Sequence, residues 1–102
     1  PRVVDRGDHG WMEHVDHAPC VDARAVRRFY ERLGVHLAVV HALDGTDLHL
    51  ENVVAAGEHP VLVDLEALLH PRLVRAGTAA GTAAGSLFAD SVLRVGLLPL
   101  CD

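Results

Sequence analysis

Two short apolar runs on either side of a turn most constrain how this chain can fold. Residues 53–56 and 61–65 are rich in Val, Leu and Ala, and Gly-Glu-His-Pro occupies residues 57–60 between them. Short apolar runs around Gly and Pro are typical of the two strands of a β-hairpin. The sequence therefore predicts an antiparallel hairpin over residues 53–65, with a turn of three or four residues.

An amphipathic helix is expected on the N-terminal side of the hairpin. Asp22 is a residue type that caps helix N-termini, because its carboxylate accepts hydrogen bonds from unpaired backbone N–H groups. Gly34 weakens such a helix by about 1 kcal/mol relative to Ala without ending it, and Asp44-Gly45 is the expected end. Apolar side chains recur every three or four residues and form one stripe: Val26, Phe29, Tyr30, Leu33, Leu37 and Val40.

The other segments give weaker patterns. Residues 11–15 are a candidate short strand, and residues 76–86, which repeat Gly-Thr-Ala-Ala, are expected to form a flexible surface loop. Residues 87–95 are apolar with polar interruptions, and a helix is favoured there over a strand. A long helix, a hairpin and a second helix together predict an α+β fold class.

Length and charge limit the possible classes of function. The 102 residues suffice for one domain or part of one, and half of them are hydrophobic, as in ordinary globular proteins. The formal net charge of −5 argues against a nonspecific nucleic-acid surface, which needs clustered positive charge. One basic cluster falls on the predicted helix, and we interpret it as a solvated face: Arg24, Arg27, Arg28 and Arg32.

Cysteine use and hydropathy favour a cytoplasmic protein. Cys20 and Cys101 lie far apart and form no Cys-x-x-Cys pair, so a disulfide scaffold is not expected. No apolar run reaches the roughly 18 residues that a membrane span requires, and no signal peptide is recognisable. The chain begins with Pro1 and stops without an evident terminus, so we expect residues 1–102 to be a partial domain truncated at both ends.

Oxygen-bearing side chains mark the open end of the predicted hairpin. Asn52 stands just before the first strand and Asp64 near the end of the second, so the turn brings them to the same end, on the order of 5–8 Å apart. A carboxylate and an amide oxygen suit Mg²⁺, which prefers oxygen ligands and keeps water for substrate phosphates. Asn52 and Asp64 are therefore predicted as metal ligands.

The loop between the helix and the hairpin carries the candidate catalytic residues. Asp47 lies five residues before Asn52, the spacing of the kinase catalytic loop, in which Asp orients the attacking hydroxyl and Asn holds metal. Asp64 then takes the place of the second metal-binding Asp. His49, two residues after Asp47, would be able to donate a hydrogen bond to the transferring phosphoryl group or to shuttle a proton.

Structural roles compete with these assignments. Asp47 also fits a turn after the helix, Asn52 a simple turn residue, and His49 a hydrogen-bonded structural histidine. Asp64 would lie inside an apolar strand, where an unpaired carboxylate is costly. Its alternative partners are two later arginines, Arg72 and Arg75. Two histidine pairs suggest a zinc site but lack a cysteine pair or ligand cluster around them: His14 with His17, and His36 with His41.

Two stretches resemble the dehydratase domain of class II lanthipeptide synthetases. They are residues 45–52 (GTDLHLEN) and residues 56–66 (AGEHPVLVDLE). Three flanking segments are similar as well: residues 17–20 (HAPC), 26–30 (VRRFY) and 90–99 (DSVLRVGLLP). The resemblance therefore covers most of the chain.

The resemblance implies a two-step reaction on a ribosomally made precursor peptide. Domains of this family resemble lipid kinases in fold, use ATP and Mg²⁺ to phosphorylate Ser and Thr, and then eliminate the phosphate to leave dehydroamino acids. By motif position, Asp47 would be the catalytic acid/base and His49 its catalytic-loop partner, while Asn52 and Asp64 would bind the nucleotide through Mg²⁺. The chain would be the centre of a kinase-like C-lobe, with a cyclase domain following in the full-length protein.

Two alternative functions remain open. The family's nucleotide-anchoring Lys is expected on a preceding lobe, since this chain contains no Lys. A small-molecule kinase of the aminoglycoside phosphotransferase type has the same Asp–Asn spacing, although it usually begins its loop with His-Gly-Asp rather than Gly45-Thr46-Asp47. A non-catalytic pseudokinase or peptide-docking module would bind the precursor peptide without transferring phosphate.

Overall fold

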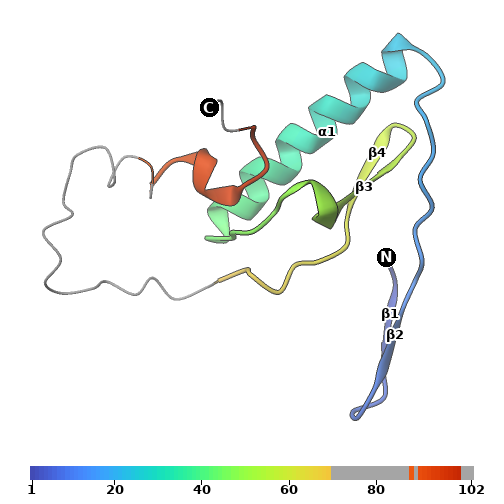
Figure 1. Ribbon diagram of the computed structural model, residues 1–102, viewed down its shortest axis with the longest axis vertical. Coiled ribbons are helices and arrows are strands. Elements are labelled where there is room, and N and C mark those ends of the chain that lie inside the picture. Colours follow the sequence, from blue (N-terminus) through green and yellow to red (C-terminus); the bar gives the residue numbers. More distant parts are fainter. Residues whose placement is uncertain (70–87, 89, 100–102) are drawn as a thin grey trace, which may run out of the picture.

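The computed structural model describes residues 1–69, 88 and 90–99. One long helix and two short antiparallel hairpins make up most of this part of the chain, which confirms the α+β class (Figure 1). The elements follow in the order β1 (Val3–Asp5), β2 (Gly10–Met12), α1 (Ala23–Ala42), η1 (Leu50–Asn52), β3 (Val53–Ala56), β4 (His59–Leu62) and η2 (Val92–Val95), where η denotes a 3-10 helix.

Helix α1 begins where the sequence predicts. Asp22 has extended backbone angles, and its carboxylate accepts a hydrogen bond from the Ala25 N–H at 2.7 Å, which satisfies one of the unpaired donors of the first turn. Gly34 lies inside the helix and does not end it. The end is at Ala42, next to the predicted Asp44-Gly45 pair, because Asp44 turns the backbone into the left-handed region with φ of 55°.

The hairpin β3–β4 is confirmed, but the predicted turn length is wrong. Ala56 pairs with His59, so the turn contains only Gly57 and Glu58. Gly57, the first residue of this turn, has φ of 60°. Glycine adopts such a positive φ more easily than any other residue, so it suits this position of a two-residue turn. The prediction assigned Pro60 to the turn, whereas a proline is tolerated in an edge strand, and β4 is such a strand in this sheet.

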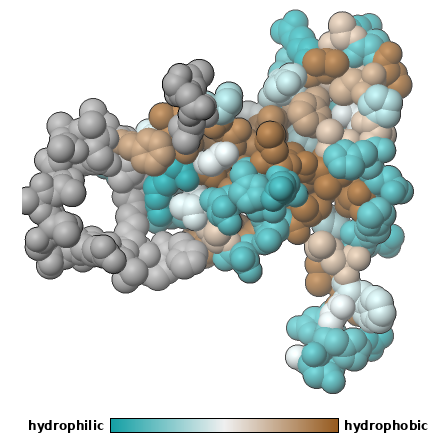
Figure 2. All heavy atoms as spheres, in the orientation of Figure 1, coloured by the Kyte–Doolittle hydropathy of each residue, from teal (hydrophilic) through white to brown (hydrophobic). Residues whose placement is uncertain are grey.

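The core lies where the C-terminal end of α1, the following loop and η2 meet. Val40, Leu48 and Val95 are fully buried there. Partly buried side chains surround them: Leu37, Val53, Leu62, Leu68 and Leu97. This cluster joins α1, β3 and β4 in one packed unit. Hydrophobic surface remains visible on this face of the molecule (Figure 2). On α1 the side chains of Val26, Tyr30 and Val39 are exposed.

A second hairpin, β1–β2, projects away from this packed unit (Figure 1). The sequence predicted a strand at residues 11–15, but the strand is Gly10–Met12 and its partner β1 was not predicted. Val3 pairs with Met12 and Asp5 with Gly10. All residues of both strands are exposed, so nothing in the described part of the chain covers this hairpin.

The C-terminal segment corrects one prediction and leaves another outside the structure. Phe88 is helical as predicted, but the predicted helix over residues 87–95 is not continuous: among residues 90–99 the helical turn is η2 at Val92–Val95, which is a 3-10 helix. Ser91 has extended backbone angles, and its hydroxyl accepts a hydrogen bond from the Leu93 N–H at 3.3 Å, so Ser91 is the N-cap of η2. The predicted flexible loop at residues 76–86 lies outside the described residues.

No helix among the described residues is long and apolar enough to span a bilayer.

Candidate active site on the loop after α1

The loop between α1 and η1 is held by main-chain hydrogen bonds from three sides. Gly45 donates to the Val40 carbonyl at 2.9 Å, Thr46 to that of Ala67 at 3.1 Å, and Leu48 to that of Val95 at 2.9 Å. Gly45 is buried, and a Cβ at this position would lie 2.5 Å from Val40 Cγ1 and 2.8 Å from Leu68 Cδ2. Only glycine therefore fits here without moving its neighbours, and the path of the loop is fixed.

Asp47 occupies a strained position on this fixed loop. Its φ is 62°, in the left-handed region that non-glycine residues adopt rarely, although Asp tolerates it better than most. Such a conformation costs on the order of 1–3 kcal/mol and is typical of functional sites. The Asp47 side chain is 69% exposed while its neighbour Leu48 is buried, so the strain presents the carboxylate to solvent.

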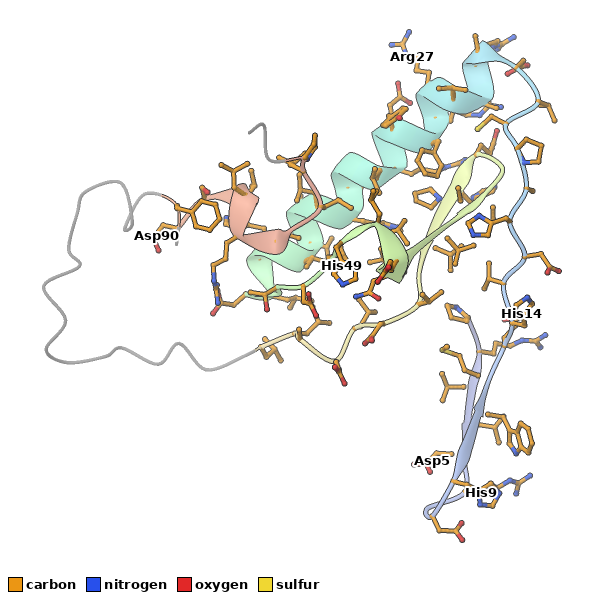
Figure 3. All side chains as sticks on the ribbon, viewed as in Figure 1. Asp5, His9, His14, Arg27, His49 and Asp90 are labelled. Atoms are coloured by element: carbon orange, nitrogen blue, oxygen red, sulfur yellow. The ribbon has the colours of Figure 1, made fainter. Side chains whose placement is uncertain are left out.

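His49 faces Asp47 through one ring nitrogen. Its Nε2 lies 3.5 Å from Asp47 Oδ1, and its Nδ1 accepts a hydrogen bond from the Glu51 N–H at 3.3 Å (Figure 3). An Nδ1 that accepts from a backbone amide carries no proton, so the neutral ring carries its proton on Nε2. His49 therefore presents a donor toward the Asp47 carboxylate and the space beside it.

The Asn52 side chain is hydrogen-bonded to the backbone of Asp47. Its Nδ2 donates to the Asp47 carbonyl oxygen at 2.8 Å across the predicted five-residue spacing. A carbonyl can only accept, so the atom facing it must be the amide nitrogen. The Asn52 Oδ1 is thereby directed away from the loop backbone, and it is the atom available to a cation.

Asp64 lies beyond the end of β4, not inside a strand as the sequence predicted. The two-residue turn sets Asn52 opposite Val63, and the Val63 N–H donates to the Asn52 carbonyl at 3.1 Å. Asp64 follows at once, is exposed, and its Oδ1 accepts from the Glu66 N–H at 3.2 Å. The cost of a buried carboxylate thus does not arise, and the alternative partners Arg72 and Arg75 lie outside the described residues.

The structure brings Asp47, His49 and Asn52 into direct contact. Asp64 is connected to them through its neighbour Val63, whose N–H donates to the Asn52 carbonyl. The oxygen donors Asn52 Oδ1 and the Asp64 carboxylate are of the kind that Mg²⁺ prefers, so the residues fit a hard divalent cation. Within the described residues, no group of three or more His, Cys, Asp and Glu side chains is arranged to hold a metal. The His14 ring, considered for zinc, bonds instead to Asp16 at 3.1 Å.

An apolar groove starts beside His49. It has a volume of about 640 Å³ and lies between α1, the η1–β3 segment and residues 96–99. Its walls include Phe29, Tyr30, Leu50 and Val53. Of the candidate site residues, His49 lines this groove.

Sequence reasoning missed an ion-pair cluster at the other end of the hairpin. Arg28 and Arg32, predicted as part of a solvated face, both bind the Glu58 carboxylate, Arg28 through Nε at 2.6 Å and Arg32 at 2.9 Å. Arg32 also donates to the Glu58 carbonyl at 2.7 Å. The hydrogen bonds from Arg28 and then Arg32 lower the pKa of Glu58, and the bond to Glu58 raises that of Arg28. The i, i+4 spacing of the two arginines was the available signal.

Comparisons with known proteins identify a family and a relative of this chain. A family model described as "Domain of unknown function (DUF4135)" matches residues 1–101. The chain is similar to the lacticin 481/lactococcin biosynthesis protein LcnDR2 of Lactococcus lactis subsp. lactis, with 36% identity over 101 residues. The match covers 96% of this chain and 11% of that protein, so the chain spans about a ninth of its relative's length.

Proposed function

This chain belongs to the DUF4135 family, and from that premise we propose that it is the catalytic-loop portion of a lanthipeptide synthetase dehydratase domain. The observation that carries the proposal is the contact between Asn52 and Asp47, which closes the Asp-x-x-x-x-Asn loop of a phosphotransferase. The relationship to a lacticin 481 biosynthesis protein supports the same reaction class. In this proposal α1, the loop and β3–β4 are the centre of a kinase-like C-lobe.

Each residue of the site has a distinct role in the proposed phosphoryl transfer. Asp47, exposed and held at positive φ, orients the Ser or Thr hydroxyl of the precursor peptide and accepts its proton. His49 donates its Nε2–H to the anionic oxygens that develop beside Asp47. Asn52 Oδ1 and the Asp64 carboxylate would hold Mg²⁺, which neutralises phosphate charge when ATP is bound.

The peptide substrate and the second step complete the proposal. We infer that the peptide lies along the apolar groove that His49 lines together with Tyr30 and Leu50, which brings a Ser or Thr side chain near the exposed Asp47 carboxylate. After transfer, elimination of the phosphate leaves dehydroalanine or dehydrobutyrine in the peptide. A cyclase domain in the full-length protein would act on that product.

Mass spectrometry of the precursor peptide tests the proposal. The full-length synthetase that contains this chain is incubated with the peptide, ATP and Mg²⁺. We expect phosphate adducts and then the loss of one water per modified Ser or Thr. Replacing Asp47 by Asn should remove both signals, because the hydroxyl loses the group that orients it. Asp16→Asn, which removes an exposed carboxylate far from the loop, is the matched control and should leave them unchanged.

The outcomes separate the proposed function from its alternatives. An unchanged peptide mass with the wild-type protein would contradict the dehydratase and favour a docking module that binds the peptide without chemistry. Phosphate transfer to an aminoglycoside but not to the peptide would favour the small-molecule kinase. The position of His49 after Asp47, instead of before it, argues against that kinase.

A further inference from the structure

Three successive residues at the C-terminal end of η2 contact the loop that carries Asp47. They are Arg94, Val95 and Gly96, about fifty positions further along the chain. Each contact is of a different kind, and each reaches a different residue of the loop. We propose that residues 94–96, named the strap from here on, fix the conformation of Asp47, with Arg94 as a positioning residue for the reaction.

The first contact is an ion pair at the start of the loop. The guanidinium of Arg94 binds the carboxylate of Asp44. The side chains are only 21% and 32% exposed, respectively, so solvent screens this pair less than a surface pair. Asp44 has φ of 55° and is the residue at which the chain leaves α1. The ion pair therefore holds the loop at its point of departure from the helix.

The second contact is made by the main chain and the core together. The Leu48 N–H donates to the Val95 carbonyl at 2.9 Å, directly after Asp47. The Val95 side chain is 0% exposed and that of Leu48 is 2% exposed, and both lie in the same apolar cluster. Val95 thus anchors Leu48, the residue on the C-terminal side of Asp47, while Arg94 anchors Asp44 on the N-terminal side.

The third contact brings the strap backbone against Asp47 itself. Gly96 has φ of 87°, and a Cβ added there would lie 3.9 Å from Asp47 Cα and 3.5 Å from the Leu48 nitrogen. These are ordinary van der Waals distances, so a Cβ would fit the space, and the positive φ is what favours glycine here. The strap backbone thus packs next to the backbone of Asp47 and Leu48.

These contacts explain how the unfavourable backbone of Asp47 is maintained. A residue in the left-handed region persists only where its surroundings determine it. Asp47 is bracketed by Asp44 and Leu48, and the strap anchors both. This inference rests on the proposed function, since a positioned Asp47 matters for catalysis only if it orients the peptide hydroxyl.

Arg94→Gln in the full-length synthetase tests the strap. A displacement of about 1 Å at a reacting group can reduce a rate by about 100-fold, so we expect kcat for peptide phosphorylation to fall 10- to 100-fold while KM for ATP and peptide stays the same. Arg27→Gln is the matched control, because Arg27, which points away from the fold in Figure 3, is an exposed arginine whose partner Glu31 lies on the same helix. This variant should change neither constant.

Two further variants keep the test decisive if Arg94→Gln misfolds. Arg94→Lys keeps the positive charge that faces Asp44 and should hold kcat to within a few-fold of the wild type. The double variant Asp44→Asn with Arg94→Gln removes both charges of this ion pair and should keep the fold. Its kcat should still be reduced, because the geometry that the ion pair imposes is lost.

Amide hydrogen exchange of Leu48 provides a readout that does not depend on activity. Loss of the strap should speed exchange of this amide about tenfold or more in Arg94→Gln and leave it unchanged in Arg27→Gln. A wild-type protein that transfers no phosphate would refute the proposed function, while Leu48 exchange would still decide whether the strap holds the loop. Unchanged exchange with unchanged kcat, or a fall in folded protein with full kcat per folded molecule, would overturn the strap.

Discussion

The two hairpins of this chain have the same architecture and opposite surroundings. Both are antiparallel pairs of short strands, joined by tight turns that contain a glycine with positive φ, Gly7 in one and Gly57 in the other. In β1–β2 every strand residue is exposed, including Val3 at 68% and Trp11 at 69%. In β3–β4 seven of the eight strand residues are buried or half-buried.

Contacts beyond the hairpin account for the difference. A two-stranded hairpin alone is marginally stable in water, so its order must come from what it packs against. Glu58 ties the tip of β3–β4 to α1, and Ala18 adds a short parallel bridge to Ala56 along its side. Val53 and Leu62 join the core at its base. The proposed catalytic residues lie at that base, where the hairpin is held most tightly.

The largest expected difference between the hairpins is catalytic. Asp64 and Asp5 are both exposed, and both accept a hydrogen bond from the backbone N–H two residues on, at 3.2 Å and 2.7 Å. Asp64→Asn in the full-length protein should reduce peptide phosphorylation by roughly 1,000-fold or more, because a charged metal ligand is lost. Asp5→Asn is the matched change and should leave activity at the wild-type level. Equal activities of the two variants would remove Asp64 from the metal site.

The next largest difference concerns packing. Gly45→Ala places a methyl group in contact with Val40 and Leu68, and overpacking of this kind costs about 1–3 kcal/mol. The loss should appear as faster native-state amide exchange throughout the C-terminal half of α1. Gly10→Ala in β2 crowds only the Val4 carbonyl, at 3.2 Å, so the α1 amides should exchange as in the wild type. Slower exchange in Gly45→Ala would show that the loop is not close-packed.

The smallest expected difference depends on pH. Hydrogen bonds from Arg28 and Arg32 lower the pKa of Glu58 below its ordinary value of 4.5. A carboxyl whose pKa is lowered by folding stabilises the folded state above its unfolded pKa, and this stabilisation is lost as pH falls through the folded pKa. At pH 7, β3–β4 amides should therefore exchange several-fold faster in Glu58→Gln than in the wild type, and the difference should vanish in acid.

Glu13→Gln is the corresponding change beside β1–β2. Glu13 accepts from the Arg2 backbone N–H at 3.0 Å and is exposed. Replacing Glu13 should leave the amide hydrogen exchange of β3–β4 unchanged at every pH. A pH-independent difference for Glu58→Gln would mean that the carboxylate charge does not hold the hairpin tip.

Features set by neighbouring residues were predictable from the sequence, and features set by distant ones were not. The Asp22 cap depends on contacts within a few residues and is confirmed. The stripe of α1 packs inward only in part: Val40 is buried, while Val26 and Tyr30 are exposed. The turn of β3–β4 was misjudged because the rule that places proline in turns does not consider whether a strand is an edge. Likewise, the predicted helix over residues 87–95 includes the helical Phe88, but Ser91 and Gly96 cap a separate 3-10 turn at Val92–Val95.

The candidate site divides in the same way. The spacing of Asp47, Asn52 and Asp64 identified the residues and their order along the chain. It gave no sign of the positive φ at Asp47, because that conformation depends on contacts about fifty residues away. Glu58 was treated as a turn residue, since its arginine partners are 26 and 30 positions distant.

The hydrogen bond from Asn52 to the Asp47 carbonyl also has a consequence for which amino acid can stand at position 52. The two ends of this side chain serve different neighbours: nitrogen faces the main chain, and oxygen faces outward. An aspartate would set two oxygen atoms against each other, and a glutamine would be a methylene too long for the same reach. Asparagine combines a short side chain with an amide that donates through nitrogen and accepts through a separate oxygen. The hydrogen bond to the Asp47 carbonyl uses the nitrogen and leaves the oxygen for a ligand.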